Sequence, residues 1–214
     1  MRRGVVLVAV AALALVGAAP AHAHAGVDHT TPRNGSVVST APSTITVTFD
    51  EPVSLDSASL TGPSGAQLPS TARAAGAAIV ITPSGALPRG PIAASWRATS
   101  DDGHQVTGSI AFIIGKPPKT GRPQNVTLMP ALPARMSGDA PGLLQLTFGA
   151  ALSGGQVTWT SASVSEPITW TVSRKAKFAV AAGVLPLPGV WTVKASLIRA
   201  DNSVVVTSGT VTLK

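Results

Sequence analysis

Two short stretches of this sequence hold the side chains best suited to bind a metal ion. Ala21-His22-Ala23-His24-Ala25 follows the N-terminal apolar segment, and Ser100-Asp101-Asp102-Gly103-His104 lies near the middle of the chain. If a signal peptidase cuts immediately before His24, this residue offers a free α-amine and an imidazole to one metal ion. Asp102 and His104 are two residues apart, so in an extended segment both side chains leave the same face. Together the three residues would supply three nitrogens and one carboxylate oxygen, which suits Cu(II) in a square-planar or tetragonal arrangement.

Residues 1–23 have the three parts of a secretory signal peptide. Met1-Arg2-Arg3 is basic, Gly4–Gly17 is an unbroken apolar run, and Ala21 and Ala23 are the small residues before a cut after Ala23. A cut after Ala21 is also allowed and would leave His24 in the third position, where it could bind Cu(II) through backbone nitrogens instead. The apolar run is too short for a transmembrane span. We expect an exported protein of the periplasm, cell envelope or extracellular space, without stable membrane insertion after cleavage; the alternative is an uncleaved membrane anchor.

The charge and the lack of cysteine exclude several classes of function. Charged residues make up 12% of the chain, and the net charge of +7 falls to +5 when Arg2 and Arg3 leave with the leader. This surplus is scattered, with Arg174-Lys175-Ala176-Lys177 as the only cluster, which predicts weak attraction to anionic envelope polymers and no nucleic-acid binding. Without cysteine there are no disulfides, no Cys-based zinc site, no thiol chemistry and no lipoprotein anchor.

The first half, residues 24–115, has the pattern of a β-sandwich or small Greek-key barrel. Short segments with strand periodicity alternate with Gly/Pro turns, and no helical period is present. The segment between the last two strands, residues 100–104, is then an exposed connection, where binding groups commonly lie. Trp96 is predicted to be a core residue, and His29 and Asp101 are predicted to be solvated. The expected strands are Ile45–Phe49, Ala77–Thr82, Ile92–Thr99 and Val106–Ile114.

Residues 116–124 read as a linker, because they are rich in proline, glycine and charge and have no apolar period. Strand signals resume in residues 125–214 and predict six or seven strands, which favours a second, immunoglobulin-like β-sandwich. This half contains no histidine and only Asp139, Glu166 and Asp201 as acids. A metal or acid–base centre is therefore not expected there, and an interaction module or a spacer is the default interpretation.

Several motifs of the first half occur in a fixed order. They are His24-Ala25-Gly26-Val27, Thr31-Pro32-Arg33-Asn34-Gly35, Phe49-Asp50-Glu51-Pro52-Val53, and Trp96-Arg97-Ala98-Thr99-Ser100-Asp101-Asp102-Gly103-His104 followed by Val106-Thr107-Gly108-Ser109. In this order they resemble the CopC-like copper-resistance family, including its Thr-Pro-x-x-Gly turn and its Trp-Arg-x-x-Ser-x-Asp-x-His pattern. The Pro-Gly-x-Trp-Thr-Val segment of the second half weakly resembles accessory β domains of copper-import systems.

The resemblance implies a cupredoxin-like β-barrel that binds one Cu(II) per chain through His24, Asp102 and His104. Glu51 matches a glutamate that lies near the metal in some members. A copper transporter of the CopD type in the inner membrane is a candidate partner. Gln105 departs from the family, which often has proline after the site histidine. The Met-rich segment that some members use for Cu(I) is also missing from this half, so the resemblance implies a Cu(II)-only site.

We therefore predict an exported Cu(II)-binding protein for sequestration, copper resistance or delivery to a membrane copper transporter, and not an enzyme. One alternative is a structural cell-envelope β-sandwich protein with incidental copper affinity. Another is a copper-dependent oxidative enzyme with an N-terminal histidine brace. Against that enzyme, Asp102 would occupy the metal plane, and the chain has no tyrosine to build an aromatic substrate platform.

Overall fold

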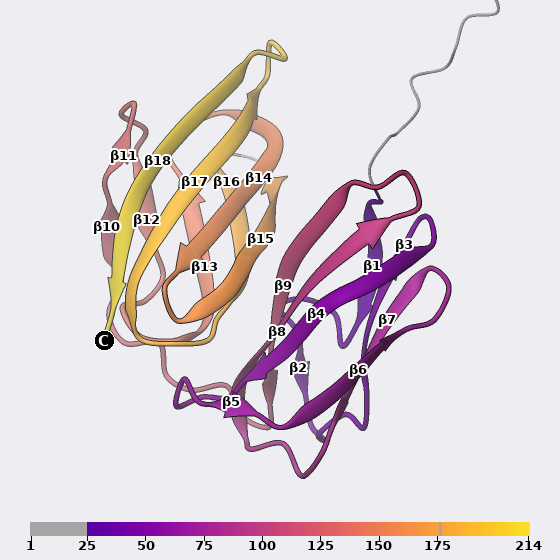
Figure 1. The fold of residues 1–214 in the computed structure, drawn as a ribbon. Helices are drawn as coiled ribbons and strands as arrows, with labels where there is room; N and C mark the ends of the chain where they lie inside the picture. Colours follow the sequence, from indigo (N-terminus) through magenta and orange to yellow (C-terminus); the bar gives the residue numbers. More distant parts are fainter. Residues whose placement is uncertain (1–24, 176) are drawn as a thin grey trace, which may run out of the picture.

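The computed structural model describes residues 25–175 and 177–214 and confirms the all-β prediction (Figure 1). No helix occurs in the described residues, so none of them forms a helix that could cross a bilayer. The strands of the first half are β1 (Val27–Thr31), β2 (Val37–Val38), β3 (Ile45–Phe49), β4 (Val53–Thr61), β5 (Gln67–Leu68), β6 (Ser70–Ala74), β7 (Ala78–Pro83), β8 (Gly90–Ser100) and β9 (Gln105–Ile114). Those of the second half are β10 (Gln124–Val126), β11 (Leu128–Met129), β12 (Ala134–Met136), β13 (Gly142–Phe148), β14 (Leu152–Ser161), β15 (Val164–Arg174), β16 (Ala179–Leu185), β17 (Gly189–Arg199) and β18 (Val204–Leu213).

The first half is a sandwich of two sheets. One sheet has the order β1-β3-β7-β6, and the facing strands pair in the order β5-β4-β8-β9-β2. Strand β3 shows why the chain adopts this arrangement: Ile45, Val47 and Phe49 are buried, and the threonines between them are half-buried, which is the period-two pattern of a strand with one core face. Trp96 is buried as predicted and meets Phe49 edge-on, with ring centroids 6.5 Å apart.

Strands β8 and β9 form a long antiparallel hairpin that is largely buried on both faces. On β9, Ile110, Phe112 and Ile114 belong to the core of the first half, whereas Ala111 and Ile113 belong to the core of the second half. Alternate side chains of one strand therefore serve two cores. This explains why β9 ends in a continuous apolar run, as strands covered on both faces do.

The second half also consists of two sheets, which share β15. The paired orders are β10-β12-β13-β16-β15 and β15-β14-β17-β18-β11. Three tryptophans, Trp159, Trp170 and Trp191, are almost completely buried between the sheets. The rings of Trp159 and Trp170 lie 4.9 Å apart, and Trp191 Nε1 donates a hydrogen bond to the Leu187 carbonyl at 3.0 Å. The β signals of this half thus produce a packed core, with the additional short strands β10–β12 at its edges.

The two halves are joined by a parallel contact between β9 and β15, with Ile168 opposite Ser109. Ser109 Oγ donates a hydrogen bond to the Glu166 carbonyl at 2.8 Å. Asn34 bridges the same two strands: its Nδ2 donates to the Thr169 carbonyl at 2.9 Å, and its Oδ1 accepts from the β9 backbone at 3.0 Å. The turn that contains Asn34 therefore helps to fix β15 against the hairpin β8–β9.

Candidate metal centre

The turn between β8 and β9 presents the candidate ligands Asp102 and His104 at one end of the first sandwich (Figure 1). Two backbone hydrogen bonds close this turn, from Ser100 N to the His104 carbonyl and from Gly103 N to the Ser100 carbonyl, both 2.9 Å long. Gly103 has a φ of 86°, a conformation that glycine adopts without the steric cost of a side chain. The local sequence therefore forms a tight turn at the end of a rigid hairpin.

The structure brings Asp102 and His104 into direct contact. Asp102 Oδ2 lies 2.9 Å from His104 Nδ1, and Asp102 Oδ1 accepts a hydrogen bond from the His104 backbone amide at 3.0 Å. Ser100 Oγ also donates to Asp102 Oδ1 and lies 3.1 Å from the His104 carbonyl. Both side chains remain accessible, with 30% of the Asp102 side chain and 52% of the His104 side chain exposed. The two groups thus form a pre-arranged pair of one carboxylate and one imidazole, open to solvent.

The hydrogen bonds of the turn keep the Asp102 carboxylate charged. The Ser100 hydroxyl, followed by the His104 backbone amide, lowers the pKa of Asp102 from 3.8 to about 2. Hydrogen bonds of this kind favour the charged form because a carboxylate is the stronger acceptor. Asp102 is therefore an anion over the whole physiological pH range and can bind a cation without first losing a proton.

The described chain begins at the same end of the sandwich as this turn (Figure 1). Gly26 N donates to Asp50 Oδ1 at 2.7 Å, and Asp50 N donates to the Gly26 carbonyl at 3.0 Å. These two bonds attach the start of the chain to the segment between β3 and β4. Because Val53 pairs with Ser100, that segment leads directly to the β8–β9 turn. His24 itself lies outside the described residues, as do the predicted leader and both predicted cleavage sites.

Glu51, the weaker sequence candidate, follows Asp50 in this segment. It stands two residues before Val53, just as Asp102 stands two residues after the paired Ser100, so the register places Glu51 and Asp102 at the same end of the strand pair. Glu51 Oε1 is buried and has no hydrogen-bond partner among the described residues. A buried carboxylate oxygen without a partner is energetically costly, which makes Glu51 an unexplained acid beside the turn.

The described residues do not by themselves form a complete metal site. Within residues 25–175 and 177–214, no group of three or more His, Asp or Glu side chains could hold a metal ion. His29 and Asp101 are exposed, and His29 Nδ1 contacts only its neighbour Asp28, at 2.9 Å, among the hydrogen bonds of the described chain. Of the three predicted ligands, the structure therefore unites two and does not describe the third.

Sequence reasoning missed two residues that support the turn. Ser100 was part of the recognised motif, but its spacing alone did not reveal that its hydroxyl holds Asp102; a serine two residues before an aspartate in a tight turn is the available signal. Asp50 was named only as part of the Phe49–Val53 motif, although it anchors the start of the chain. Its partner Gly26 is 24 residues away, so no local pattern pointed to it.

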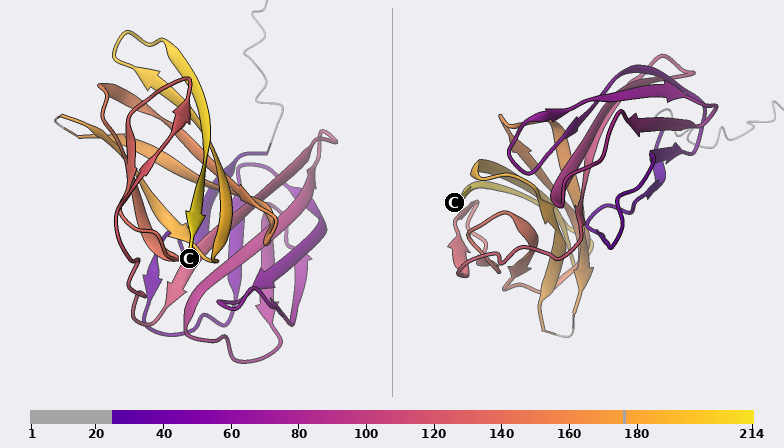
Figure 2. Two further views of the ribbon diagram at one scale, coloured as in Figure 1. Left: turned by 90° about the vertical axis from the view of Figure 1, so that its left-hand side faces the viewer. Right: turned by 90° about the horizontal axis from the view of Figure 1, so that it is seen from below.

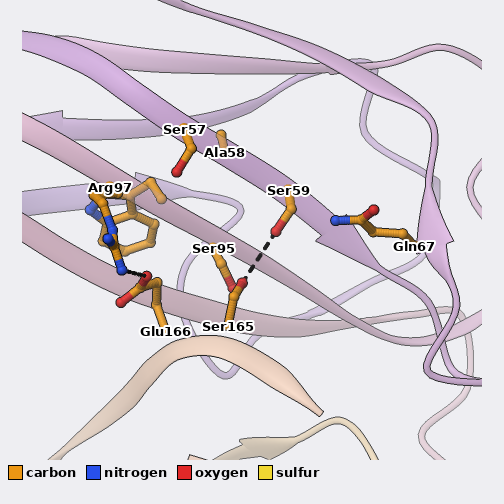
Figure 3. A pocket seen from close by; sticks show the side chains of 9 residues that line it. Ser57, Ala58, Ser59, Gln67, Ser95, Arg97, Ser165 and Glu166 are labelled. Carbon is orange, nitrogen blue, oxygen red and sulfur yellow. Dashed lines mark hydrogen bonds and ion pairs between the residues drawn. The ribbon is translucent and has the colours of Figure 1, made fainter. Parts of the chain in front are cut away.

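A separate cleft of about 350 Å³ lies where β4 and β8 meet the start of β15 (Figure 3). Arg97 reaches across it to Glu166, with Nη2 and Oε1 2.9 Å apart, and Ser59 and Ser165 face each other at 3.4 Å. The other lining residues are Ser57, Ala58, Gln67, Ser95 and Trp96. No histidine lines this cleft, and its one carboxylate is already paired with Arg97. The cleft is therefore a polar seam between the halves and not a second candidate metal site.

Comparisons with known proteins concern mainly the first half. Residues 27–115 match the family model of the CopC domain. The solved structure of PcoC, a methionine-rich copper resistance protein from Escherichia coli, is 28% identical with a TM-score of 0.38, over 42% of this chain and 98% of PcoC. CopC from Methylosinus trichosporium OB3b is 20% identical with a TM-score of 0.39, over 42% of this chain and 93% of that protein. No curated protein matches the chain.

Proposed function

We propose that this chain is an exported Cu(II)-binding protein, because residues 27–115 match the family model of the CopC domain. It sequesters copper outside the cytoplasm and passes it to a membrane copper transporter, for which the CopD type is the candidate. The observation that carries it is the Asp102–His104 pair at the end of the sandwich where the described chain begins.

The spacing of this pair supports its role as two adjacent ligands of one metal ion. Nitrogen and carboxylate oxygen donors bind first-row transition metals at about 2.0 Å, and neighbouring ligands of a square-planar ion subtend a right angle. Two such donors are then about 2.8 Å apart. The observed separation between Asp102 Oδ2 and His104 Nδ1 is 2.9 Å. The pair therefore has the separation that two adjacent ligands of one Cu(II) ion would need.

The remaining ligands are assigned to His24, through its α-amine and its imidazole after cleavage at Ala23. Asp50 supports this assignment because it fixes Gly26, two residues after His24, beside the segment that leads to the turn. Glu51, with its buried and unpaired oxygen, is assigned a secondary role as an acceptor for a donor group of the bound N-terminus or as an additional metal contact. The site would then offer one carboxylate oxygen and three nitrogens to the copper ion.

The donor set favours binding of Cu(II) without a redox step. Imidazole, amine and carboxylate suit Cu(II), whereas thiolate and thioether ligands select Cu(I). The chain has no cysteine. Its methionines outside the leader, Met129 and Met136, both belong to strands of the second half. We accordingly assign the protein a carrier role and no catalytic one.

Cu(II) titration of the mature protein, followed by electron paramagnetic resonance, tests this function. We expect one tight equivalent with nitrogen coupling, and loss of that signal in His104→Ala. Asp102→Asn should lower the affinity by more than the ~10–100-fold typical of an outer-shell partner. His29→Ala is the matched control, because His29 is also exposed and also lies 2.9 Å from an aspartate. Equal effects of the two alanine variants would contradict the proposal.

The role of the N-terminus needs a separate test. N-terminal sequencing of the secreted protein should identify His24 as the first residue. A variant with one additional alanine before His24 keeps every side chain but moves the free amine, so its copper affinity should fall. Affinity should also weaken below about pH 6, where an ordinary imidazole and an α-amine bind protons. Since the pKa of Asp102 is about 2, the loss of copper affinity at this pH comes from protonation of the nitrogen donors and not of the carboxylate.

A further inference from the structure

The hairpin that joins β15 and β16 carries an exposed cluster of three cations and one aromatic ring. Arg174, Lys175 and Lys177 are exposed, and the Phe178 side chain is 42% exposed. Lys175 N donates to the Phe178 carbonyl at 2.8 Å, which brings the two residues together across the hairpin. No ion pair of the described chain involves these three cations. In both views of Figure 2 the arms of β15 and β16 reach outward beyond the neighbouring strands.

An exposed apolar surface lies on the outer face of the same half. Ile198 on β17 pairs with Val204 on β18, and the exposed fractions are 38% for Ile198, 62% for Val204 and 49% for Val206. Ile198 and Val204 line a groove of about 400 Å³ together with Thr171 of β15. Side chains two apart on a strand share a face, so the outward row that starts at Thr171 continues toward Lys175 at the hairpin. The basic hairpin and the apolar groove therefore belong to one outer face.

The charge of the second half is suited to an anionic partner. Residues 125–214 contain seven Lys and Arg against three Asp and Glu, a net charge of +4. Two of the three acids are neutralised by ion pairs, Glu166 with Arg97 and Asp139 with Lys214. The third, Asp201, lies in the β17–β18 turn, where the amide and hydroxyl of Ser203 donate hydrogen bonds to its carboxylate. By contrast, residues 25–115 carry four Lys and Arg against six acids.

We propose that this outer face docks on the surface of an anionic phospholipid bilayer. Basic residues beside exposed phenylalanine and aliphatic side chains are the composition that binds at a charged membrane interface. Cations near such a surface are attracted by its negative potential, while the apolar side chains enter the headgroup boundary. A second copy of the same face is disfavoured as the partner, because two positively charged hairpins would repel each other. The proposal concerns residues remote in sequence from the β8–β9 turn and does not require copper.

Vesicle co-sedimentation of the full mature chain, without metal, tests this docking. The probes are neutral phosphatidylcholine vesicles and vesicles that also contain phosphatidylglycerol. We expect binding only to the anionic vesicles and weaker binding at high salt. Each Lys or Arg near the surface contributes about fivefold to the affinity, so Lys175→Gln/Lys177→Gln should weaken it about 25-fold. The matched control is Lys116→Gln/Lys119→Gln, which removes the same charge from two exposed lysines between the halves.

A second pair of variants separates the apolar contribution from charge. Phe178→Ser should weaken binding to anionic vesicles, whereas Val190→Ser, at a valine that is 60% exposed near the other end of β17, should not. Thermal unfolding of each variant verifies that it is folded. Three results would overturn the proposal: equal binding to both kinds of vesicle, equal losses in the hairpin variant and its control, or a dimer that Val204→Ser/Val206→Ser converts to monomer.

Discussion

Gly108 offers a direct test of how the packing beneath the β8–β9 turn is built. An added Cβ at this position would lie 2.7 Å from Trp96 Cζ2 and 3.2 Å from its Cη2. Real Cβ atoms essentially never approach another heavy atom so closely, so the indole must move. Trp96 is only 4% exposed and is confined by the edge-on contact with Phe49. Gly108→Ala should therefore act as an overpacking substitution.

The cost of this substitution can be worked out from the clash. Overpacking of a close-packed core typically costs ~1–3 kcal/mol, and we expect about 2 kcal/mol because a rigid ring, and not a flexible side chain, must give way. For a chain of this size that corresponds to roughly 6 °C in Tm. Urea denaturation followed by circular dichroism measures the loss. Gly85→Ala is the control, because an added Cβ there meets nothing within 4 Å, so its effect should stay within about 0.5 kcal/mol.

A double-mutant cycle then identifies the cause of the loss. Trp96→Phe removes the part of the indole that an alanine at position 108 would strike, and the buried Trp96 Nε1 has no hydrogen-bond partner to lose. In the Trp96→Phe background, Gly108→Ala should cost much less than it does in the wild type, with a coupling energy of about 1–2 kcal/mol. The reasoning is refuted if Gly108→Ala is as harmless as Gly85→Ala, or if its cost is the same in both backgrounds.

Three further predictions follow from the hydrogen bonds of the turn and of the junction between the halves. Ser100→Ala should raise the pKa of Asp102 from about 2 toward 3.8, as measured by NMR titration of its carboxyl carbon. Because the folded pKa is depressed, ionised Asp102 contributes stability that is present above about pH 4 and lost as the pH falls toward 2, and this contribution should shrink in Ser100→Ala. An unchanged pKa would mean that the serine does not hold the carboxylate. Glu166→Gln should lower the free energy of unfolding, measured in urea, by about 1 kcal/mol, since the Glu166 side chain is only 12% exposed and pairs with Arg97. An unchanged free energy of unfolding would show that the pair contributes no more than an ordinary surface ion pair. Asn34→Ala should cost ~1–3 kcal/mol, because the β9 amide and the β15 carbonyl that it bridges lose their partner. Hydrogen exchange of that β9 amide should accelerate in the variant, and unaltered protection would count against the bridge.

Strands with a local apolar pattern could be predicted from the sequence, and strands without one could not. The segment Ile45–Phe49 was identified because every second side chain is apolar and buried, and Val106–Ile114 because it ends in a continuous apolar run. Strand β6 (Ser70–Ala74) and all of β4 (Val53–Thr61) but its end at Leu60-Thr61 were missed, since they are rich in Ser, Thr and Ala and most of their side chains are partly exposed. They are strands because they pair with β8 and β7, and such pairing partners are not encoded locally.

The candidate site likewise has features that could be predicted from the sequence and features that could not. The sequence correctly placed Asp102 and His104 together, but it expected an extended segment, whereas the structure brings them into contact in a tight turn closed by Ser100. The attachment of Gly26 to Asp50, and the burial of Glu51 Oε1, depend on strands that meet only in the folded chain. The participation of His24 stays a prediction, because this residue lies outside the described part of the chain.

The double role of β9 has a practical consequence for isolating the half that matches the CopC domain model. A fragment that ends near residue 115 would lose β15, and with it the cover over Ala93, Ala111 and Ile113, all of which are 0% exposed in the whole chain. These side chains would form a new solvent-exposed apolar strip along one face of the fragment. We expect such a truncated protein to self-associate or to need polar replacements on that strip before it behaves as a monomer.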